Sequence, residues 1–177
     1  SANTTAGFSI NKWPGSSSSS VQTIGHGLGV APSWVLTKNL GSGSSITAWV
    51  NYHVGIDDSI PQNYLLYLNN TDARTDNAVH GDTAPTTSVF SFNTGSDDQD
   101  YISYCWAEVK GFSKFGRWIG NGSTSGPFIF TGFRPAFILS KRADNTSGGE
   151  WNVIDSTRDI DNPAQDKLEA HNQDAEE

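Results

Sequence analysis

The chain has 177 residues, enough for one or two domains with a sizeable core, and 17% of them are charged. Its formal net charge is −8, so we expect no nucleic-acid partner. The single cysteine, Cys105, excludes an intrachain disulfide and is predicted to be a buried, inert thiol rather than a nucleophile. No apolar run approaches the roughly 20 residues of a membrane span, so we expect no membrane insertion.

Strand patterns dominate the chain after a flexible lead-in predicted for residues 1–6. Turns rich in Gly, Asn and Ser separate the strands, and any helix is confined to a short turn near 162–169. The predicted strands cover residues 34–38, 46–54, 64–68, 88–92, 101–109, 127–133, 137–141 and 151–154. This pattern predicts an all-β fold, a mostly antiparallel β-sandwich of jelly-roll or lectin-like type.

The sequence also contains an internal repeat. Five blocks recur in the same order at offsets of about 102 to 105 residues. They pair Gly7-Phe8-Ser9 with Gly111-Phe112-Ser113, Trp13 with Trp118, Pro32–Lys38 with Pro135–Lys141, Trp49 with Trp151, and Leu66–Ala73 with Leu168–Ala175. We therefore predict a first β repeat over residues 7–110 and a second, truncated repeat over 111–177 that packs on the first.

The second repeat ends before any counterpart of the strands predicted at 88–92 and 101–109. We expect its sheet to expose unpaired edges and aromatic side chains such as Phe128, Phe130 and Phe137. A neighbouring copy, or sequence beyond Glu177, would supply the missing strands. We therefore expect a homo-oligomer, and a trimer if the chain belongs to a fibre.

No residue pattern indicates a catalytic, cofactor-binding or metal-binding site. The glycine-rich run around His26 lacks the flanking strand, helix and acidic residue of a dinucleotide site. Glu108 is the only acid within a strong strand pattern, and we expect it to face solvent or pair with a lysine such as Lys110. Glycoside hydrolysis needs two facing carboxylates, so a single strand acid such as Glu108 does not predict this activity. Calcium binding by the Asp57-Asp58 or Asp97-Asp98 pair is an open alternative to simple solvation of these loops.

Aromatic residues are numerous, with six Trp, five Tyr and nine Phe. We expect most of them in the core. Trp13 and Trp118 occupy equivalent positions of the two repeats beside loop residues, which makes them candidates for contact with a glycan or a protein partner. Core packing is the favoured alternative for both.

Four strings of the sequence carry a resemblance to a known family. They are GHGLGVAP at 25–32, the block from DTAPT to Phe90 at 82–90, YCWAEVKGFSKFG at 104–116, and the stretch from GNGS to TGFRPA at 120–136. From Gly7 to Glu177 the chain resembles a domain family of uncharacterised function. That family recurs in tail-fibre-like and other structural proteins of marine tailed bacteriophages of cyanophage and podovirus-like type.

The resemblance implies a non-enzymatic structural protein of the virion, which is assembled in the host cytoplasm. We expect a place in a host-recognising tail fibre or appendage, with other virion proteins, copies of itself and a host surface glycan as partners. It brings no established catalytic residue. Two alternatives remain, a capsid-decorating (cement) protein and a polysaccharide-degrading β-sandwich enzyme.

Overall fold

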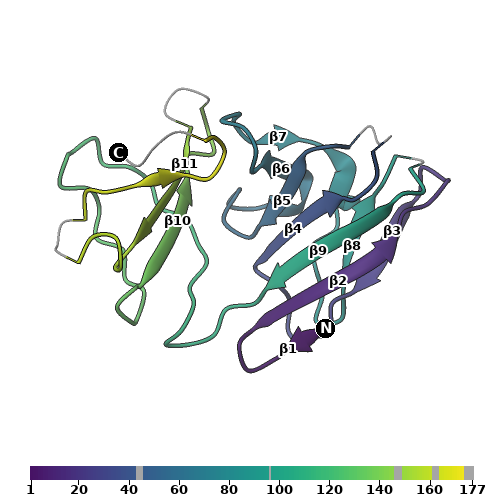
Figure 1. Ribbon diagram of the computed structural model, residues 1–177, viewed down its shortest axis with the longest axis horizontal. Coiled ribbons are helices and arrows are strands. Elements are labelled where there is room, and N and C mark those ends of the chain that lie inside the picture. Colours follow the sequence, from purple (N-terminus) through teal and green to yellow (C-terminus); the bar gives the residue numbers. More distant parts are fainter. Residues whose placement is uncertain (43–45, 96, 146–148, 161–163, 174–177) are drawn as a thin grey trace.

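The computed structural model describes residues 1–42, 46–95, 97–145, 149–160 and 164–173. This part of the chain folds into a β-sandwich with a smaller sheet at its side, as Figure 1 shows. All of its strand pairs are antiparallel. The predicted all-β, mostly antiparallel sandwich is therefore confirmed.

The larger layer is a seven-stranded sheet. Strand β9 lies inside this sheet between β2 and β4, so the beginning and the end of the first repeat are paired. The order across the sheet is β1 (Ala2–Asn3), β2 (Phe8–Pro14), β9 (Asp100–Trp106), β4 (Trp34–Asn39), β5 (Trp49–His53), β6 (Tyr64–Tyr67) and β7 (Thr75–Asp76).

Two smaller sheets complete the fold. Strands β3 (Val21–Gly25) and β8 (Val89–Asn93) form a ribbon that covers one face of the large sheet. The side sheet contains β10 (Phe137–Lys141), β11 (Trp151–Asp155) and β12 (Leu168–Glu169). Two single-turn 3₁₀ helices lie at Pro61–Asn63 and Ala78–His80. No helix within the described ranges has the length and apolarity to cross a membrane.

The main core lies between the large sheet and the β3–β8 ribbon. Side chains alternate along β9, and Tyr101, Ser103 and Cys105 point into this core. Cys105 has no solvent exposure, and desolvation raises the pKa of its thiol to about 12, which agrees with the predicted inert thiol. Other buried members are Trp13, Ile24, Val35, Val50, Phe90 and Phe92.

Local structure differs from the sequence predictions at both ends of the first repeat. Ala2–Asn3, within the expected flexible lead-in, pairs with β2 as an ordered strand. Strands β2 and β3 are not among the predicted strands, because Ser, Gly and Pro surround short apolar stretches there. Each is fixed by a distant partner, β2 by β9 and β3 by β8, which local sequence does not reveal.

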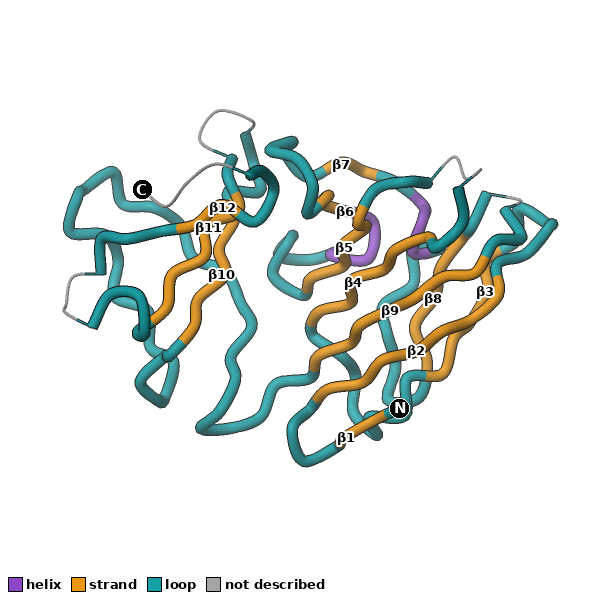
Figure 2. The backbone as a smooth tube through the Cα atoms, in the orientation of Figure 1, coloured by secondary structure: helices purple, strands orange, loops and turns teal. Residues whose placement is uncertain are grey.

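Two predictions for the second repeat also differ. Residues 127–133 form an irregular segment rather than a strand, part of the long loop between β9 and β10 in Figure 2. The turn of helix expected near 162–169 lies partly outside the described residues. Its described part, residues 164–169, contains strand β12 and no helix.

The two repeats share one strand register. Strands β4, β5 and β6 form a meander, and β10, β11 and β12 form another. In the first repeat Lys38 lies opposite Trp49, and Asn51 lies opposite Leu66. At the equivalent positions of the second repeat Lys141 lies opposite Trp151, and Val153 lies opposite Leu168. A matching register of this kind is what a duplication would produce. The two repeats and their boundaries stay predictions.

The side sheet packs against the β5–β6 end of the large sheet. Trp151 is 6% exposed and lies in a second apolar cluster with Ile56 and Leu66. Its indole N–H donates to the Tyr67 carbonyl oxygen at 2.8 Å. A separate hydrogen bond, from the Arg74 amide to the Ala143 carbonyl at 2.7 Å, joins the same two regions.

Candidate functional site

The face of the large sheet that points away from the β3–β8 ribbon is rich in aromatic rings. Alternate residues of each strand reach this face, because successive side chains of a strand point to opposite sides. Five rings from four neighbouring strands gather there and are each partly exposed. We call them the outer aromatic face: Phe8, Trp34, Trp49, Tyr104 and Trp106.

Three of these rings form a row across the strands. Trp106 lies opposite Phe8 on one side and opposite Trp34 on the other. The Trp34 and Trp106 rings are stacked, with centroids 4.1 Å apart and planes 18° apart, and the Phe8 centroid is 5.1 Å from that of Trp106. Tyr104 links this row to Trp49, at centroid distances of 6.1 Å and 6.3 Å to Trp106 and Trp49. The rings therefore form one connected surface.

A buried amide fixes the orientation of Trp34. The indole N–H donates to Asn51 Oδ1 at 2.8 Å, and Asn51 has no solvent exposure. Asn51 Nδ2 in turn donates to the carbonyl oxygen of Leu66 at 3.3 Å. Because its one polar atom is bonded to a buried neighbour on the same face of the sheet, Trp34 presents only hydrocarbon to solvent.

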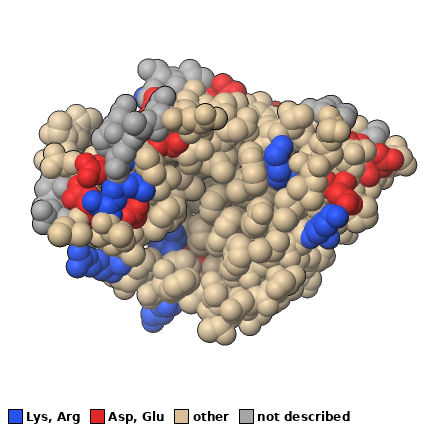
Figure 3. Space-filling model, in the orientation of Figure 1, with Lys and Arg blue, Asp and Glu red and all other residues tan. Residues whose placement is uncertain are grey.

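Few charges border the outer aromatic face. Lys12 forms an ion pair with Asp100 at 2.6 Å, and Lys38 Nζ donates to the Thr47 carbonyl at 2.5 Å. Desolvation lowers the pKa of His53, at the end of the ring row, to about 4, so its imidazole is neutral at pH 7. Figure 3 shows this face as a largely uncharged surface with a hollow between the large sheet and the side sheet.

A rigid, uncharged aromatic surface suits ligands with apolar faces and polar edges. Pyranose rings have this shape, since their axial C–H groups lie on the faces and their hydroxyls on the rim. Binding sites of this kind combine aromatic contact with a few polar groups that fix orientation. The described residues of this surface are therefore suited to binding a ligand of that shape.

The sequence model of one family, described as a domain of unknown function (DUF7483), matches residues 1–177. The chain belongs to the DUF7483 family. No curated protein and no solved structure is significantly similar to it. For this DUF7483 chain, the geometry of the surface therefore provides the main argument about function.

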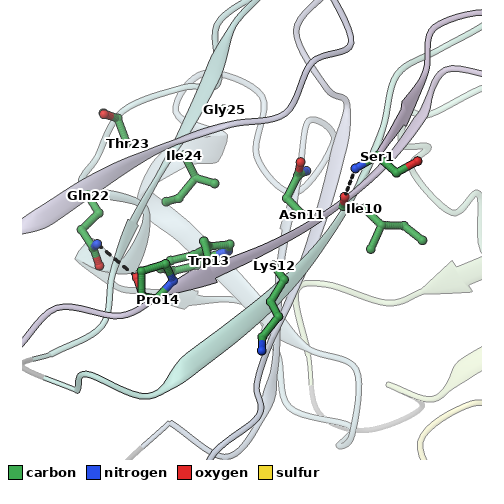
Figure 4. Close-up of a pocket in the computed structure, with 10 residues that line it drawn as sticks. All are labelled: Ser1, Ile10, Asn11, Lys12, Trp13, Pro14, Gln22, Thr23, Ile24 and Gly25. Carbon is green, nitrogen blue, oxygen red and sulfur yellow. Dashed lines mark hydrogen bonds between the residues drawn. The ribbon is translucent and has the colours of Figure 1, made fainter.

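The DUF7483 chain has a second concave feature, a groove of about 450 Å³ between β2 and β3, shown in Figure 4. Lys12, Trp13 and Gln22 are among its lining residues. Gln22 Nε2 donates to the Pro14 carbonyl oxygen at 3.3 Å and so bridges the two strands at one end. The groove holds one aromatic ring, largely buried, so the outer aromatic face is the stronger candidate site.

The structure separates the two tryptophans that the sequence singled out. Trp13 is 7% exposed, stacks on Tyr101 at 4.8 Å and donates its indole N–H to Ser103 Oγ at 3.0 Å. It therefore packs in the core, which was the favoured alternative. Trp118 is 50% exposed, so its contact with a glycan or partner stays a prediction.

Glu108 lies beyond the end of β9 rather than inside a strand. It pairs with a nearby lysine, as expected, and that lysine is Lys114 at 2.8 Å rather than Lys110; both partners are partly exposed. A surface pair of this kind contributes little to stability. It ties the two ends of a short loop together.

The remaining polar candidates are also engaged locally. His26 accepts the Leu28 amide at Nδ1 and contacts the Thr86 carbonyl at 3.1 Å, as a turn residue does. Asp57 pairs with Arg74 at 3.1 Å, and Asp58 pairs with Arg117. Within the described residues, no three His, Cys, Asp or Glu side chains gather closely enough to hold a metal.

Sequence reasoning missed the outer aromatic face as a site. Its tryptophans lie inside strands, where aromatic residues are expected in the core. The sequence signal that could have found it is the alternation of side chains along β9. Tyr104 and Trp106 share one face of the strand, and Tyr101 and Cys105 lie on the other. That signal becomes a site only when the strand order places β2 and β4 on either side of β9.

Proposed function

We propose that this DUF7483 chain is a non-enzymatic structural protein of a tailed-bacteriophage virion, in a host-recognising tail fibre or appendage. Its outer aromatic face binds a neutral glycan of the host surface. The observation that supports this most directly is the connected set of five partly exposed rings held by four strands. The resemblance of the sequence to phage structural proteins supports the virion setting.

The charge of the site favours a neutral ligand over an acidic one. The chain has a net charge of −8, which repels polyanions at long range. Lys12, beside the rings, is paired with Asp100, so no unpaired cationic cluster offsets that repulsion there. Rings held in place by strand pairing also lose little conformational entropy on binding, which improves affinity for weakly interacting sugars.

Contact with other virion proteins is the second part of the proposal. Large apolar side chains of the β9–β10 loop and of β10 are exposed, among them Ile119 (77%), Phe128 (90%), Phe130 (77%) and Phe137 (61%). Apolar surface of this kind marks protein contact sites. It also supports the capsid-decorating alternative, which differs from a fibre in the number of copies per particle. Quantitative mass spectrometry of virions distinguishes the two.

The glycan proposal is tested by titrating the chain with a panel of neutral and acidic polysaccharides in a calorimeter. Trp106→Ala removes the ring at the centre of the row and should weaken binding of a neutral polysaccharide by at least about tenfold. Trp118 is exposed beside Ile119 in the loop assigned above to contact with virion proteins, and the proposal gives it no role in glycan binding. Trp118→Ala is therefore the matched control and should leave glycan affinity unchanged. Equal losses in both variants, or binding of acidic chains alone, would contradict the proposal.

The non-enzymatic part has its own test. The chain is incubated with each polysaccharide that binds, and new reducing ends are measured. We expect none. Release of reducing ends that disappears in Glu108→Gln would replace the proposal with the polysaccharide-degrading alternative.

A further inference from the structure

An asparagine turn recurs along the described chain. In this turn the side-chain Oδ1 atom accepts a hydrogen bond from the backbone amide two residues further on, at distances between 2.6 Å and 3.1 Å. The asparagines that hold it include Asn39, Asn70, Asn77, Asn93 and Asn121. In the full sequence Asn121 is the only asparagine that is followed by glycine. The turns therefore differ in the backbone nitrogen that lies beside the side-chain amide.

The residue after an asparagine controls a reaction of its side chain. The carbon of the side-chain amide is an electrophile, and the next backbone nitrogen can attack it because the attack closes a five-membered ring. A hydrogen bond to Oδ1 assists, since a donor at this oxygen stabilises the negative charge that develops there. A Cβ on the following residue crowds the attacking nitrogen, and glycine has none. The pair Asn121-Gly122 therefore combines a polarised amide with an uncrowded nucleophile.

This pair lies on the surface of the molecule. Residues 116–126 are all exposed, in the long loop between β9 and β10 that Figure 2 shows. A Cβ placed on Gly122 would meet no heavy atom within 4 Å. Among the described residues, none accepts a hydrogen bond from the Gly122 amide. Water and hydroxide therefore reach both the amide proton of Gly122 and the side chain of Asn121.

We propose that Asn121 is a site of spontaneous deamidation in the folded chain. The deprotonated nitrogen of Gly122 attacks Cγ of Asn121, the new C–N bond closes a succinimide ring, and the side-chain nitrogen leaves as ammonia. Water then opens the ring. Cleavage at Cγ restores the normal backbone with a carboxylate side chain, and cleavage at the main-chain carbonyl gives an isoaspartyl linkage. Overall an amide and a water become a carboxylic acid and ammonia, with no oxidation or reduction.

The reaction changes the charge of the loop between β9 and β10. Residues 109–143 contain six Lys and Arg residues and no Asp or Glu. A carboxylate at position 121 is therefore the first negative charge in this stretch. It arises beside Trp118 and Ile119, which are 50% and 77% exposed, in the loop assigned above to contact with virion proteins. Its effect on that contact rests on the proposed function, whereas the modification itself does not.

Ageing of the full chain tests the proposal. The purified protein is incubated for weeks at physiological temperature, at neutral and at mildly alkaline pH, and peptide mapping by tandem mass spectrometry follows each asparagine. Asn77 is the matched internal control, because it is exposed and its Oδ1 accepts the Val79 amide at 2.9 Å, but Ala78 follows it. We expect Asn121 to convert at least about tenfold faster than Asn77, and faster still at the higher pH. The product should contain both aspartyl and isoaspartyl linkages.

One substitution isolates the role of the following residue. The φ of Gly122 is +69°, a backbone conformation that asparagine adopts more readily than most side chains, so Gly122→Asn adds a Cβ with little strain. Conversion at position 121 should then slow at least about tenfold. A synthetic peptide of residues 116–127 measures the reaction without the fold. The folded chain should react within about tenfold of the peptide, because the loop is exposed.

Each of these measurements has an outcome that would overturn the proposal. Conversion of Asn121 no faster than that of Asn77 would show that the glycine gives no advantage. An aspartyl product alone would exclude the succinimide, and an unchanged rate in Gly122→Asn would exclude control by the following residue. A folded chain that stays intact while the peptide deamidates would show that the loop protects the site.

Discussion

The two repeats contain the same three-strand meander in different surroundings. In the first, β4–β5–β6 lies inside a seven-stranded sheet under a second layer, and in the second, β10–β11–β12 stands alone at its side. Both meanders keep one register. The segments equivalent to β2 and β3 form strands only in the first repeat, where β9 and β8 are present. A meander thus folds from contiguous sequence, whereas outer strands need distant partners.

The same comparison explains where a binding surface can arise. Val35 of β4 is 2% exposed beneath the ribbon, and its counterpart Ile138 is 43% exposed. On the opposite face the relation reverses, because Trp49 is partly exposed and its counterpart Trp151 is 6% exposed. The second repeat uses this face to pack on the first. In the first repeat the side sheet covers this face at Leu66, while the five rings of the outer aromatic face stay partly exposed.

Among equivalent residues of the two repeats, we expect the largest difference in stability cost between Trp151 and its counterpart Trp49. Trp151→Ala removes a buried ring and an indole hydrogen bond to Tyr67, so it should cost about 3–5 kcal/mol of the free energy that holds the side sheet. Trp49→Ala removes a partly exposed ring and should cost about 1 kcal/mol. Urea unfolding followed by near-ultraviolet circular dichroism measures both. Equal losses would show that the two faces are not used differently.

Acid should weaken the first repeat through its buried histidine. Desolvation lowers the pKa of His80 to about 4, so the unfolded chain binds a proton more readily between about pH 6.5 and pH 4. The contribution of His80 to the free energy of unfolding is complete above pH 6.5 and falls by about 3 kcal/mol as the pH drops to 4. His53, also lowered to about 4, acts in the same direction.

His80→Phe keeps a ring against Tyr52 and Phe92 while removing the titrating group. The variant should therefore lose the part of the pH dependence between 6.5 and 4 that His80 contributes and keep the part that comes from His53, in urea unfolding curves. Identical pH profiles for wild type and His80→Phe would show that His80 does not carry the effect.

A smaller contrast is expected at the aliphatic pair. Val35→Ala opens space in the main core and should cost about 2 kcal/mol of unfolding free energy. Ile138→Ala changes a side chain that is 43% exposed and should cost below about 1 kcal/mol in the isolated chain. Thermal unfolding of the two variants decides this. A cost at Ile138 equal to that at Val35 would mean that its face is already covered.

Sequence reasoning reached the fold class and most strands of the two meanders, because alternation and turns are local signals. It missed β2 and β3, where strand formation depends on pairing with β9 and β8. It predicted a strand at 127–133 from apolar residues alone, and that segment has no partner in the described chain. The outer aromatic face needed the same long-range information, since its rings come from strands up to about a hundred residues apart.

The central claim is that sugar contacts the outer aromatic face of the first repeat. The six tryptophans provide the most direct measurement, because fluorine-labelled tryptophan gives one nuclear magnetic resonance signal per residue. During titration with a neutral polysaccharide that binds, the signals of Trp34, Trp49 and Trp106 should shift. Those of the remaining tryptophans, Trp13, Trp118 and Trp151, should stay in place. Shifts confined to Trp118, or to Trp13 in the β2–β3 groove, would contradict the account.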